Sequence, residues 1–252
     1  MLERVLADAA AFASDSELID RDGWLQLTTP SRPECSRNGV FICRLDPDDA
    51  DERIAEITRY YRERNLGLRW VVGPSSTPAD LSDRLTRAGI PVFGIALGMH
   101  MPVPMHIPDL PPSIELRPVE SHDLDTYVDI TVRGWEHQAR SHAETEQLAR
   151  LMFSEGNRQR AWVVYENGEP VGTSVLCLLP GVGYFQGAAV LAERRRRGLY
   201  VAMLHHRLAL LRGLGIEHAV IWASEATSAG VCRRAGFVPL CRAVFHELPQ
   251  PQ

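Results

Sequence analysis

Apolar and polar positions along the chain follow two periods, and their order predicts an α/β protein. Short runs with strand character, such as residues 68–73 (LRWVVG) and 218–224 (HAVIWAS), alternate with amphipathic stretches of helical length. Residues 46–65 begin with acidic side chains and end with basic ones, which is the charge order that a helix dipole favours. Strands are also expected over residues 17–27 and 39–45, with a Pro/Ser/Arg-rich loop between them, and in succession over 158–191, the last of them over 183–191. This order predicts a mixed sheet, with α+β character, more than an all-parallel one.

A proline-rich segment divides the chain. Residues 101–113 (MPVPMHIPDLPPS) hold five prolines and show no periodicity. Such a composition is typical of an extended linker between domains. We therefore predict one domain over residues 1–100 and a second over residues 114–252.

Two segments resemble each other at the same place in each half. ERNLGLRWVVGP…RLTRAGI in the first half and LRGLGIEHAVIWAS…VCRRAGF in the second share a strand, a helix, Arg-Ala-Gly and a large apolar residue. One match of this kind could arise by chance. Its position in the order of elements favours an internal duplication.

The stretch 184–198, YFQGAAVLAERRRRG, is the strongest chemical feature of the sequence. It predicts a strand, a basic turn and the glycine that opens the following helix. The first turn of a helix carries unpaired N–H groups and the positive end of the dipole. A glycine lets a diphosphate approach the main chain, and arginines add charge-assisted contacts. Four cations at a solvated helix start oppose its dipole, so the pattern favours a bound anion over a bare helix end.

Composition and net charge limit the kinds of anion that the basic turn is expected to bind. The chain has 252 residues, 45% apolar and 23% charged, and a formal net charge of −5, which excludes disordered and fibrous classes. A local basic feature in an acidic chain indicates a small anionic ligand more than a nucleic acid. Every basic residue is arginine. Genome composition or avoidance of self-acylation could explain the absence of lysine.

Cysteine usage and hydropathy indicate the expected setting. The five cysteines are odd in number and show no paired Cys/His ligand spacing, which argues against a disulfide framework and a structural zinc. No apolar run reaches the ~18 residues that a membrane span needs, and the first residues do not resemble a signal peptide. We expect a cytoplasmic monomer or homodimer that binds no metal, nucleic acid or membrane.

The arginine turn resembles a known motif. VLAERRRRGLYVAML is similar to the acyl-CoA-binding motif of the GNAT N-acetyltransferases, whose core is Gln/Arg-x-x-Gly-x-Gly/Ala. Arg195, Gly198 and Tyr200 fill the three fixed places, although Tyr200 is larger than the usual residue there. The resemblance covers about residues 114–248, because EATSAGVCRRAGFVPL also looks like the second signature of the family.

This resemblance implies a fold and a reaction. The expected fold is the GNAT-like acyl-CoA N-acyltransferase fold in duplicated form, with a degenerate first half whose equivalent segment (DPDDADER) is acidic. The expected reaction transfers an acetyl group from acetyl-CoA, or another short acyl-CoA, to a primary amine of a small molecule or peptide by direct attack in a ternary complex. The implied cofactor-binding residues are Ala189, Val190, Arg195, Arg196, Arg197, Gly198, Leu199 and Tyr200.

Catalytic residues are harder to predict. Cys232 stands where many family members carry a tyrosine that protonates the leaving thiolate, and its unperturbed pKa of ~8.5 suits that role. The alternative is a small core cysteine. Glu225 is a candidate general base, but it could equally complement a helix dipole, and a water molecule could serve as the base.

Four further residues are candidates for the acceptor and acyl sites. Trp135 and His137 lie where the family commonly shapes the acceptor pocket, and Tyr184 and Gln186 either line the acyl site or fill the core. The alternative to an enzyme is a non-catalytic acyl-CoA-binding or sensing protein, which the missing tyrosine would suit. A dimerisation role for the first half is compatible with both.

Overall fold

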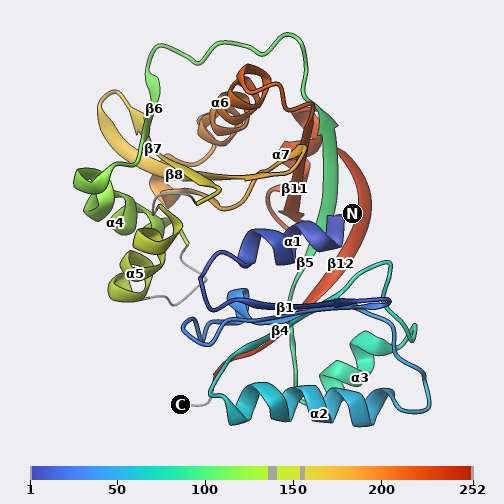
Figure 1. Cartoon of the computed structure of the whole chain (residues 1–252). Coiled ribbons are helices and arrows are strands. Elements are labelled where there is room, and N and C mark those ends of the chain that lie inside the picture. The colour runs from blue at the N-terminus through green and yellow to red at the C-terminus, as the bar shows by residue number, and fades with distance from the viewer. Residues whose placement is uncertain (1, 136–140, 154–156, 251–252) are drawn as a thin grey trace. The chain divides into compact units, whose positions relative to one another are not determined.

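The computed structural model describes residues 2–135, 141–153 and 157–250 (Figure 1). Contacts divide the chain into two compact units. Unit 1 comprises Met1–Met99, Trp222–Arg233 and Val238–Gln252, and unit 2 comprises His100–Ile221 and Arg234–Phe237.

Unit 1 is not continuous in sequence because the last strand of the chain pairs with a strand of the first half. Strand β12 (Val238–Leu248) lies antiparallel to β4 (Leu68–Val72), with Val244 opposite Val72 and Leu248 opposite Leu68. The position of the proline-rich segment predicts that this strand belongs to the second domain, residues 114–252. A pairing partner so far away in the chain leaves no local signal.

The sheet of unit 1 runs in the order β1-β2-β3-β4-β12-β5 and is mixed, since β3 and β4 are parallel and β1, β2 and β3 are antiparallel neighbours. Its remaining elements are α1 (Leu2–Ala10), β1 (Glu17–Arg21), β2 (Trp24–Thr28), η1 (Cys35–Arg37), β3 (Gly39–Cys43), α2 (Ala50–Glu63), α3 (Leu81–Arg87), β5 (Val92–Pro102) and α7 (Ala229–Arg234); β5 and α7 extend into unit 2.

A tight turn splits the first predicted strand. Residues 17–27 were expected to form one strand, but Arg21 lies opposite Trp24 and Asp22-Gly23 turns the chain between them. Gly23 has φ +71°, the left-handed value that such a two-residue hairpin turn requires. The Asp-Gly pair is therefore the signal for β1 and β2 that the sequence analysis missed.

Both faces of the unit 1 sheet are covered. Alternation along the strands sends Phe41 and Val71 to the face that packs against α1, and Val40 and Trp70 to the face that packs against α2 and α3. Figure 1 shows α1 on one side of these strands and α2 and α3 on the other. Two apolar layers therefore hold this unit together.

A buried histidine joins β12 to α3. The His246 side chain is fully buried, and its Nδ1 lies 2.8 Å from the carbonyl oxygen of Ile90. A carbonyl can only accept, so Nδ1 donates and Nε2 is the bare acceptor for the Ser82 hydroxyl at 2.8 Å. Burial lowers the pKa of His246, against an opposing contribution from the Ile90 carbonyl.

We expect this histidine to make unit 1 sensitive to acid. An unfolded histidine, with a pKa of about 6.5, takes up its proton before the folded one, so stability is kept above that pH and is lost as the pH falls below it. Urea unfolding at pH 7.5 and 5.5 should show a smaller loss in His246→Asn, which keeps a donor for Ile90 but cannot titrate. Equal losses in the two proteins would show that His246 is not responsible.

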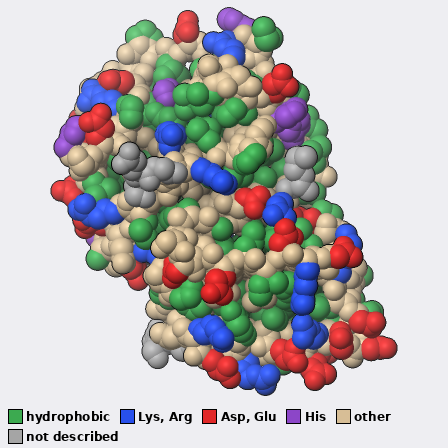
Figure 2. Space-filling model, viewed as in Figure 1, with side chains coloured by type: hydrophobic (Ala, Val, Ile, Leu, Met, Phe, Trp, Pro, Cys, Tyr) green, Lys and Arg blue, Asp and Glu red, His purple; other side chains and the backbone are tan. Residues whose placement is uncertain are grey.

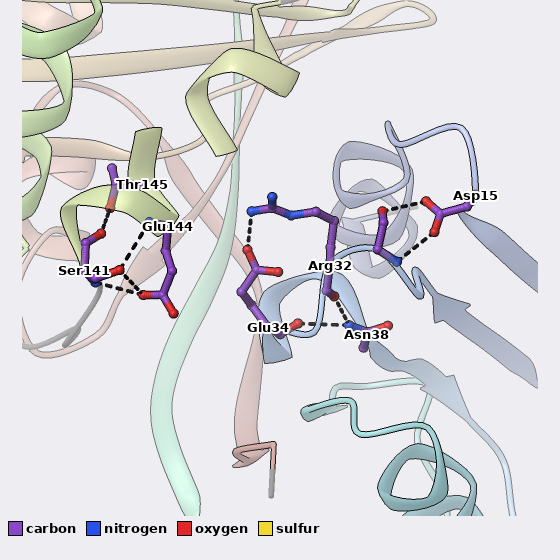
Figure 3. A network of polar contacts seen from close by, with 8 residues as sticks. Asp15, Arg32, Glu34, Asn38, Ser141, Glu144 and Thr145 are labelled. Atoms are coloured by element: carbon purple, nitrogen blue, oxygen red, sulfur yellow. Dashed lines mark hydrogen bonds and ion pairs between the residues drawn. The ribbon is translucent and has the colours of Figure 1, made fainter. Parts of the chain in front are cut away.

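Side-chain hydrogen bonds fix the loop between β2 and β3 (Figure 3). Asn38 accepts from the N–H of Thr29 at 2.8 Å and donates to the carbonyls of Arg32 and Glu34. Asp15 accepts from both the N–H and the hydroxyl of Ser31. The Pro/Ser/Arg-rich segment predicted as a loop is thus an ordered turn, because the buried amide of Asn38 and the partly exposed carboxylate of Asp15 replace the missing sheet hydrogen bonds.

Unit 2 is built on an antiparallel meander in the order β9-β8-β7-β6, with β10 also on β8 and β11 parallel to β9. Its elements are β6 (Ile114–Pro118), η2 (Ser121–Asp123), α4 (Leu124–Gly134), α5 (His142–Met152), β7 (Gln159–Glu166), β8 (Glu169–Leu179), β9 (Val182–Tyr184), β10 (Ala188–Val190), η3 (Ala192–Arg194), α6 (Leu199–Gly213) and β11 (His218–Ser224), of which β11 ends in unit 1.

Helix α5 starts with a capping box, in which Ser141 and Glu144 each bond the other's main-chain N–H (Figure 3). Helices α4 and α6 cover opposite faces of β8. Thr173 bonds Thr131 of α4 at 3.2 Å, whereas a Cβ added to the next residue, Gly172, would lie 2.7 Å from the Met203 side chain of α6.

The order of elements repeats, as the echo in the sequence predicts. The succession β3, α2, β4, α3, β5 has the same types and order as β10, α6, β11, α7, β12. The start of α2 differs from that of α6 in charge, since Asp46, Asp48, Asp49, Asp51 and Glu52 are all exposed there. Figure 2 shows acidic side chains gathered at lower right, over α2 and α3. This helix start repels phosphate.

Candidate functional site

The turn before α6 presents main-chain N–H groups to solvent. Gly198 is the N-cap of α6 and has φ +81°, and Arg196 two residues earlier has φ +65°. Gly198 has no side chain with which to cap this helix start, and among the described residues a Cβ on Gly198 would meet no atom within 4 Å. A left-handed residue followed by a helical one, as at Gly198 and Leu199, can turn successive N–H groups to one side and form an anion-binding nest. The predicted turn has the geometry that a phosphate group needs.

The four arginines are not equally available for a ligand. Arg194 and Arg197 both contact the Glu166 carboxylate, at 3.3 and 3.2 Å, and Arg194 also pairs with Glu169. These hydrogen bonds to Glu169 and Glu166 raise the pKa of Arg194. Arg197 was predicted to contact phosphate, and in this structure it is held by the end of the β7–β8 hairpin.

Arg195 reaches back over β10 instead of outward. Its Nε donates to the carbonyl of Val190 at 3.1 Å, and its Nη2 lies 3.4 Å from the carbonyl of Gly134 at the end of α4. Arg196 has an exposed side chain. Among the predicted cationic ligands, Arg196 is therefore the one best placed to meet an incoming phosphate without first leaving a contact.

Hydrogen bonds at its two ends define how β10 sits on β8. The N–H of Leu191 donates to the carbonyl of Val171 at 3.0 Å, and the N–H of Val175 donates to the carbonyl of Gly187 at 2.8 Å. Such pairs alternate along an antiparallel ladder, so the main chain of Ala189, midway between them, also faces β8.

The main-chain groups of Ala188 and Val190 therefore point away from β8. In the part of the chain that the structure describes, β10 pairs with no other strand, so this edge is open apart from the Val190 carbonyl, which accepts from Nε of Arg195. An open strand edge is where an extended, amide-containing ligand can add its own hydrogen bonds. Both Val190 and Ala188 therefore have outward main-chain groups, whereas the main-chain groups of Ala189, also predicted as a ligand contact, face β8.

A bulge separates β9 from β10, although one strand over 183–191 was expected. Tyr184 lies opposite Cys177 and Ala188 opposite Ser174, so three residues on one side face two on the other. Gly187, at φ +28°, allows the bend. The bulge turns β10 off the line of β9, while the N–H of Phe185 still bonds β11.

The predicted acyl-site and acceptor residues occupy different environments. Tyr184 is buried and Gln186 is half-buried. Trp135 follows α4 and keeps 36% of its surface exposed, which leaves a ring face for a partner. His137 lies outside the described residues.

Helix α4 approaches β10 closely at Gly134. A Cβ there would lie 2.7 Å from the Cβ of Ala189, so only glycine permits this contact. The pairing places the end of α4, and with it Trp135, beside the open edge.

Both predicted catalytic residues, Cys232 and Glu225, lie in unit 1. The Cys232 side chain, on α7, is fully buried, as expected for a core cysteine. Both carboxylate oxygens of Glu225 accept hydrogen bonds from Arg242, at 3.1 to 3.3 Å. Each oxygen of this candidate base already has a cationic partner. Leu199 is buried and Tyr200 half-buried at the start of α6, so their main-chain N–H groups contribute more to the turn than their side chains.

Three residues escaped the sequence analysis: Ala188, Glu166 and Arg207. Only strand register reveals Ala188, and Glu166 is remote in sequence from the arginines that it binds. Arg207 had a signal, since it interrupts the apolar i, i+4 stripe of Met203 and Leu211 on α6.

Two kinds of feature, a metal-binding cluster and a membrane-spanning helix, are absent from the described residues. They contain no group of three or more His, Cys, Asp or Glu side chains arranged to hold a metal ion. None of the helices described is both long enough and apolar enough to cross a bilayer.

Comparison with known proteins gives a family model for part of the chain. Residues 124–237 match the family model "Acetyltransferase (GNAT) family". No curated protein matches the chain.

Solved structures match over nearly the whole chain. A GCN5-related N-acetyltransferase from Kribbella flavida has a TM-score of 0.73 at 15% identity, covering 100% of this chain and 96% of its own. A functionally unknown conserved protein from Staphylococcus epidermidis has a TM-score of 0.71 at 14% identity over 95% and 96%. A tandem GNAT protein from the clavulanic acid biosynthesis pathway has a TM-score of 0.62 at 15% identity over 100% and 88%. The likeness to these structures shows that the chain has a GNAT fold.

Proposed function

We propose that the protein is an acetyl-CoA-dependent N-acetyltransferase acting on a primary amine. The observation that carries this proposal is the open edge of β10 leading directly into the uncapped turn at Gly198. The edge suits the amide-containing arm of an acyl-CoA, and the turn suits its diphosphate. One continuous main-chain surface thus matches both parts of the same ligand.

The chain's own groups suggest how transfer would proceed. The outward N–H groups of Ala188 and Val190 can donate to a thioester carbonyl and stabilise the oxyanion that forms when the amine nitrogen attacks its carbon. The C–S bond then breaks, the amine loses a proton to solvent or a base, and the thiolate is protonated. Most of the rate enhancement would come from positioning and electrostatic stabilisation, with no metal in the reaction.

Thiol release measures this activity directly. Purified protein with acetyl-CoA and a panel of amino acids, polyamines, aminoglycosides and peptides should release free CoA, detected by a thiol reagent, with at least one amine. Mass spectrometry should find an acetyl group on the amine nitrogen. Tight CoA binding without acetylation of any amine would instead support a non-catalytic acyl-CoA-binding protein, which the fully buried Cys232 also suits.

We expect Cys232→Ala to affect stability more than catalysis. Because the thiol is fully buried, removing it leaves a small cavity and should cost about 1–2 kcal/mol of unfolding free energy. Thiol release should stay within about threefold of the wild-type rate. A loss of about 100-fold or more in kcat, without loss of fold, would return Cys232 to the role of proton donor.

The N-terminal half is proposed to be a degenerate GNAT-like domain. It repeats the order of elements, but the start of α2 carries exposed carboxylates where α6 carries the arginine turn. A single CoA site per chain is therefore expected, and calorimetry that finds two would contradict it.

A further inference from the structure

A fully buried arginine lies in the helix that begins at the anion-binding turn. Arg207 has 0% of its surface exposed and stands between Met203 and Leu211 on the apolar face of α6. A buried guanidinium is expensive unless its donors are matched by acceptors in good geometry. Its retention in an apolar stripe therefore calls for a specific set of partners.

Those partners are main-chain carbonyls from three segments. Nε of Arg207 donates to Met203 of its own helix at 3.0 Å. Nη1 donates to Val175 of β8 at 3.0 Å and to Gln186 at 3.4 Å. The guanidinium carbon also lies 4.4 Å from the ring centroid of Phe185. Both Phe185 and Gln186 belong to the bulge between β9 and β10.

This contact set compensates for the break in the sheet. In a regular ladder the carbonyl groups at this point would face N–H groups of the neighbouring strand, but a bulge displaces them. The guanidinium group of Arg207 supplies these donors from α6 instead. Because the group is planar and rigid, it can donate to two carbonyls at once. It thereby joins α6, β8 and the bulge into one unit.

We propose that Arg207 is a positioning residue for acyl transfer, which rests on the function proposed above. By holding the bulge, it sets the angle at which β10 leaves β8 and so the place of the outward N–H groups of Ala188 and Val190. The turn at Gly198 does not depend on these contacts. Arg207 therefore controls the thioester end of the ligand site and leaves the diphosphate end unchanged.

The rate constant kcat and the dissociation constant for CoA report separately on the thioester end and the diphosphate end of the site. Arg207→Met fills a similar volume without donors, and it should lower kcat for thiol release about 10- to 100-fold, since small misplacements of catalytic groups have effects of this size. The dissociation constant for CoA should change by no more than about threefold. Arg207→Lys, which keeps the charge but not the fork, should fall between Arg207→Met and wild type in kcat.

Leu211→Ala is the matched control. Leu211 is also fully buried on α6, one turn further on, and its side chain packs on Gly183 of β9, which lies outside the bulge. It should reduce thermal stability while leaving kcat close to wild type. A kcat loss in Leu211→Ala equal to that in Arg207→Met, or a parallel loss of CoA affinity in Arg207→Met, would overturn the proposal.

Amide hydrogen exchange tests the same contact without any activity. The N–H of Leu191 and the N–H of Val175, which close the ladder between β10 and β8, should exchange at least about tenfold faster in Arg207→Met than in Leu211→Ala. If wild type releases no thiol, the proposed function fails, and exchange still decides whether Arg207 holds the bulge. Equal exchange in the two variants would overturn its positioning role.

Discussion

Replacing Gly198 with valine should reduce CoA affinity about 100-fold or more, which corresponds to ~2.7 kcal/mol. Gly198 has φ +81°, a conformation that costs an L-residue about 1–2 kcal/mol and a β-branched one more. A side chain there would also project into the open space above the turn. Relief of the strain would rotate the N–H groups of α6 out of the nest. Isothermal titration calorimetry with CoA measures the loss.

Gly215→Val provides the matched control. Gly215 follows α6 at its other end, has φ +69°, and likewise has open space around its missing Cβ. Both variants should lose at least about 1–2 kcal/mol of unfolding free energy, but CoA affinity should fall only in Gly198→Val. Equal loss of affinity in the two variants would show that strain at any helix end, and not the turn, accounts for the result.

Replacing Val190 with proline should reduce the rate of acetyl transfer by about 100-fold while the fold survives. Proline lacks the N–H that Val190 directs to the open edge of β10, and no strand in the described chain uses that N–H. The loss therefore falls on the group proposed to stabilise the oxyanion. Thiol release under saturating acetyl-CoA is the appropriate measurement.

Ala189→Pro should behave in the opposite way. Its N–H faces β8, so proline there breaks the ladder and should lower the melting temperature sharply. A Val190→Pro protein that transfers acetyl groups at the wild-type rate would remove the edge of β10 from the mechanism. Unfolding of Val190→Pro to the same extent as Ala189→Pro would contradict the assigned register.

Features encoded by neighbouring residues were predictable from the sequence. The turn before α6 depends on a glycine, a basic run and the helix that follows, all within a few residues, and the structure has a left-handed Gly198 at the start of α6. The mixed sheet and the GNAT fold were also predicted correctly. In both cases apolar periodicity and turn chemistry agree along the chain.

Features that depend on distant partners could not be predicted in the same way. Arg197 pairs with Glu166, which lies in another hairpin. The sequence alone could not show that this arginine already has an acidic partner. The bulge depends on the buried Arg207, and the return of β12 to β4 depends on a pairing across most of the chain. The Asp22-Gly23 turn is different. Two adjacent residues encode it, so the sequence alone was enough to predict it.

The central claim is that one acyl-CoA lies along the edge of β10 with its diphosphate at the α6 turn. Titration of isotope-labelled protein with CoA, followed by NMR, tests it residue by residue. The account predicts saturable shifts concentrated in the amides of Ala188, Val190 and residues 195–200, with weaker shifts in Gly198→Val. Saturable shifts that cluster elsewhere, or no shifts at millimolar CoA, would contradict it.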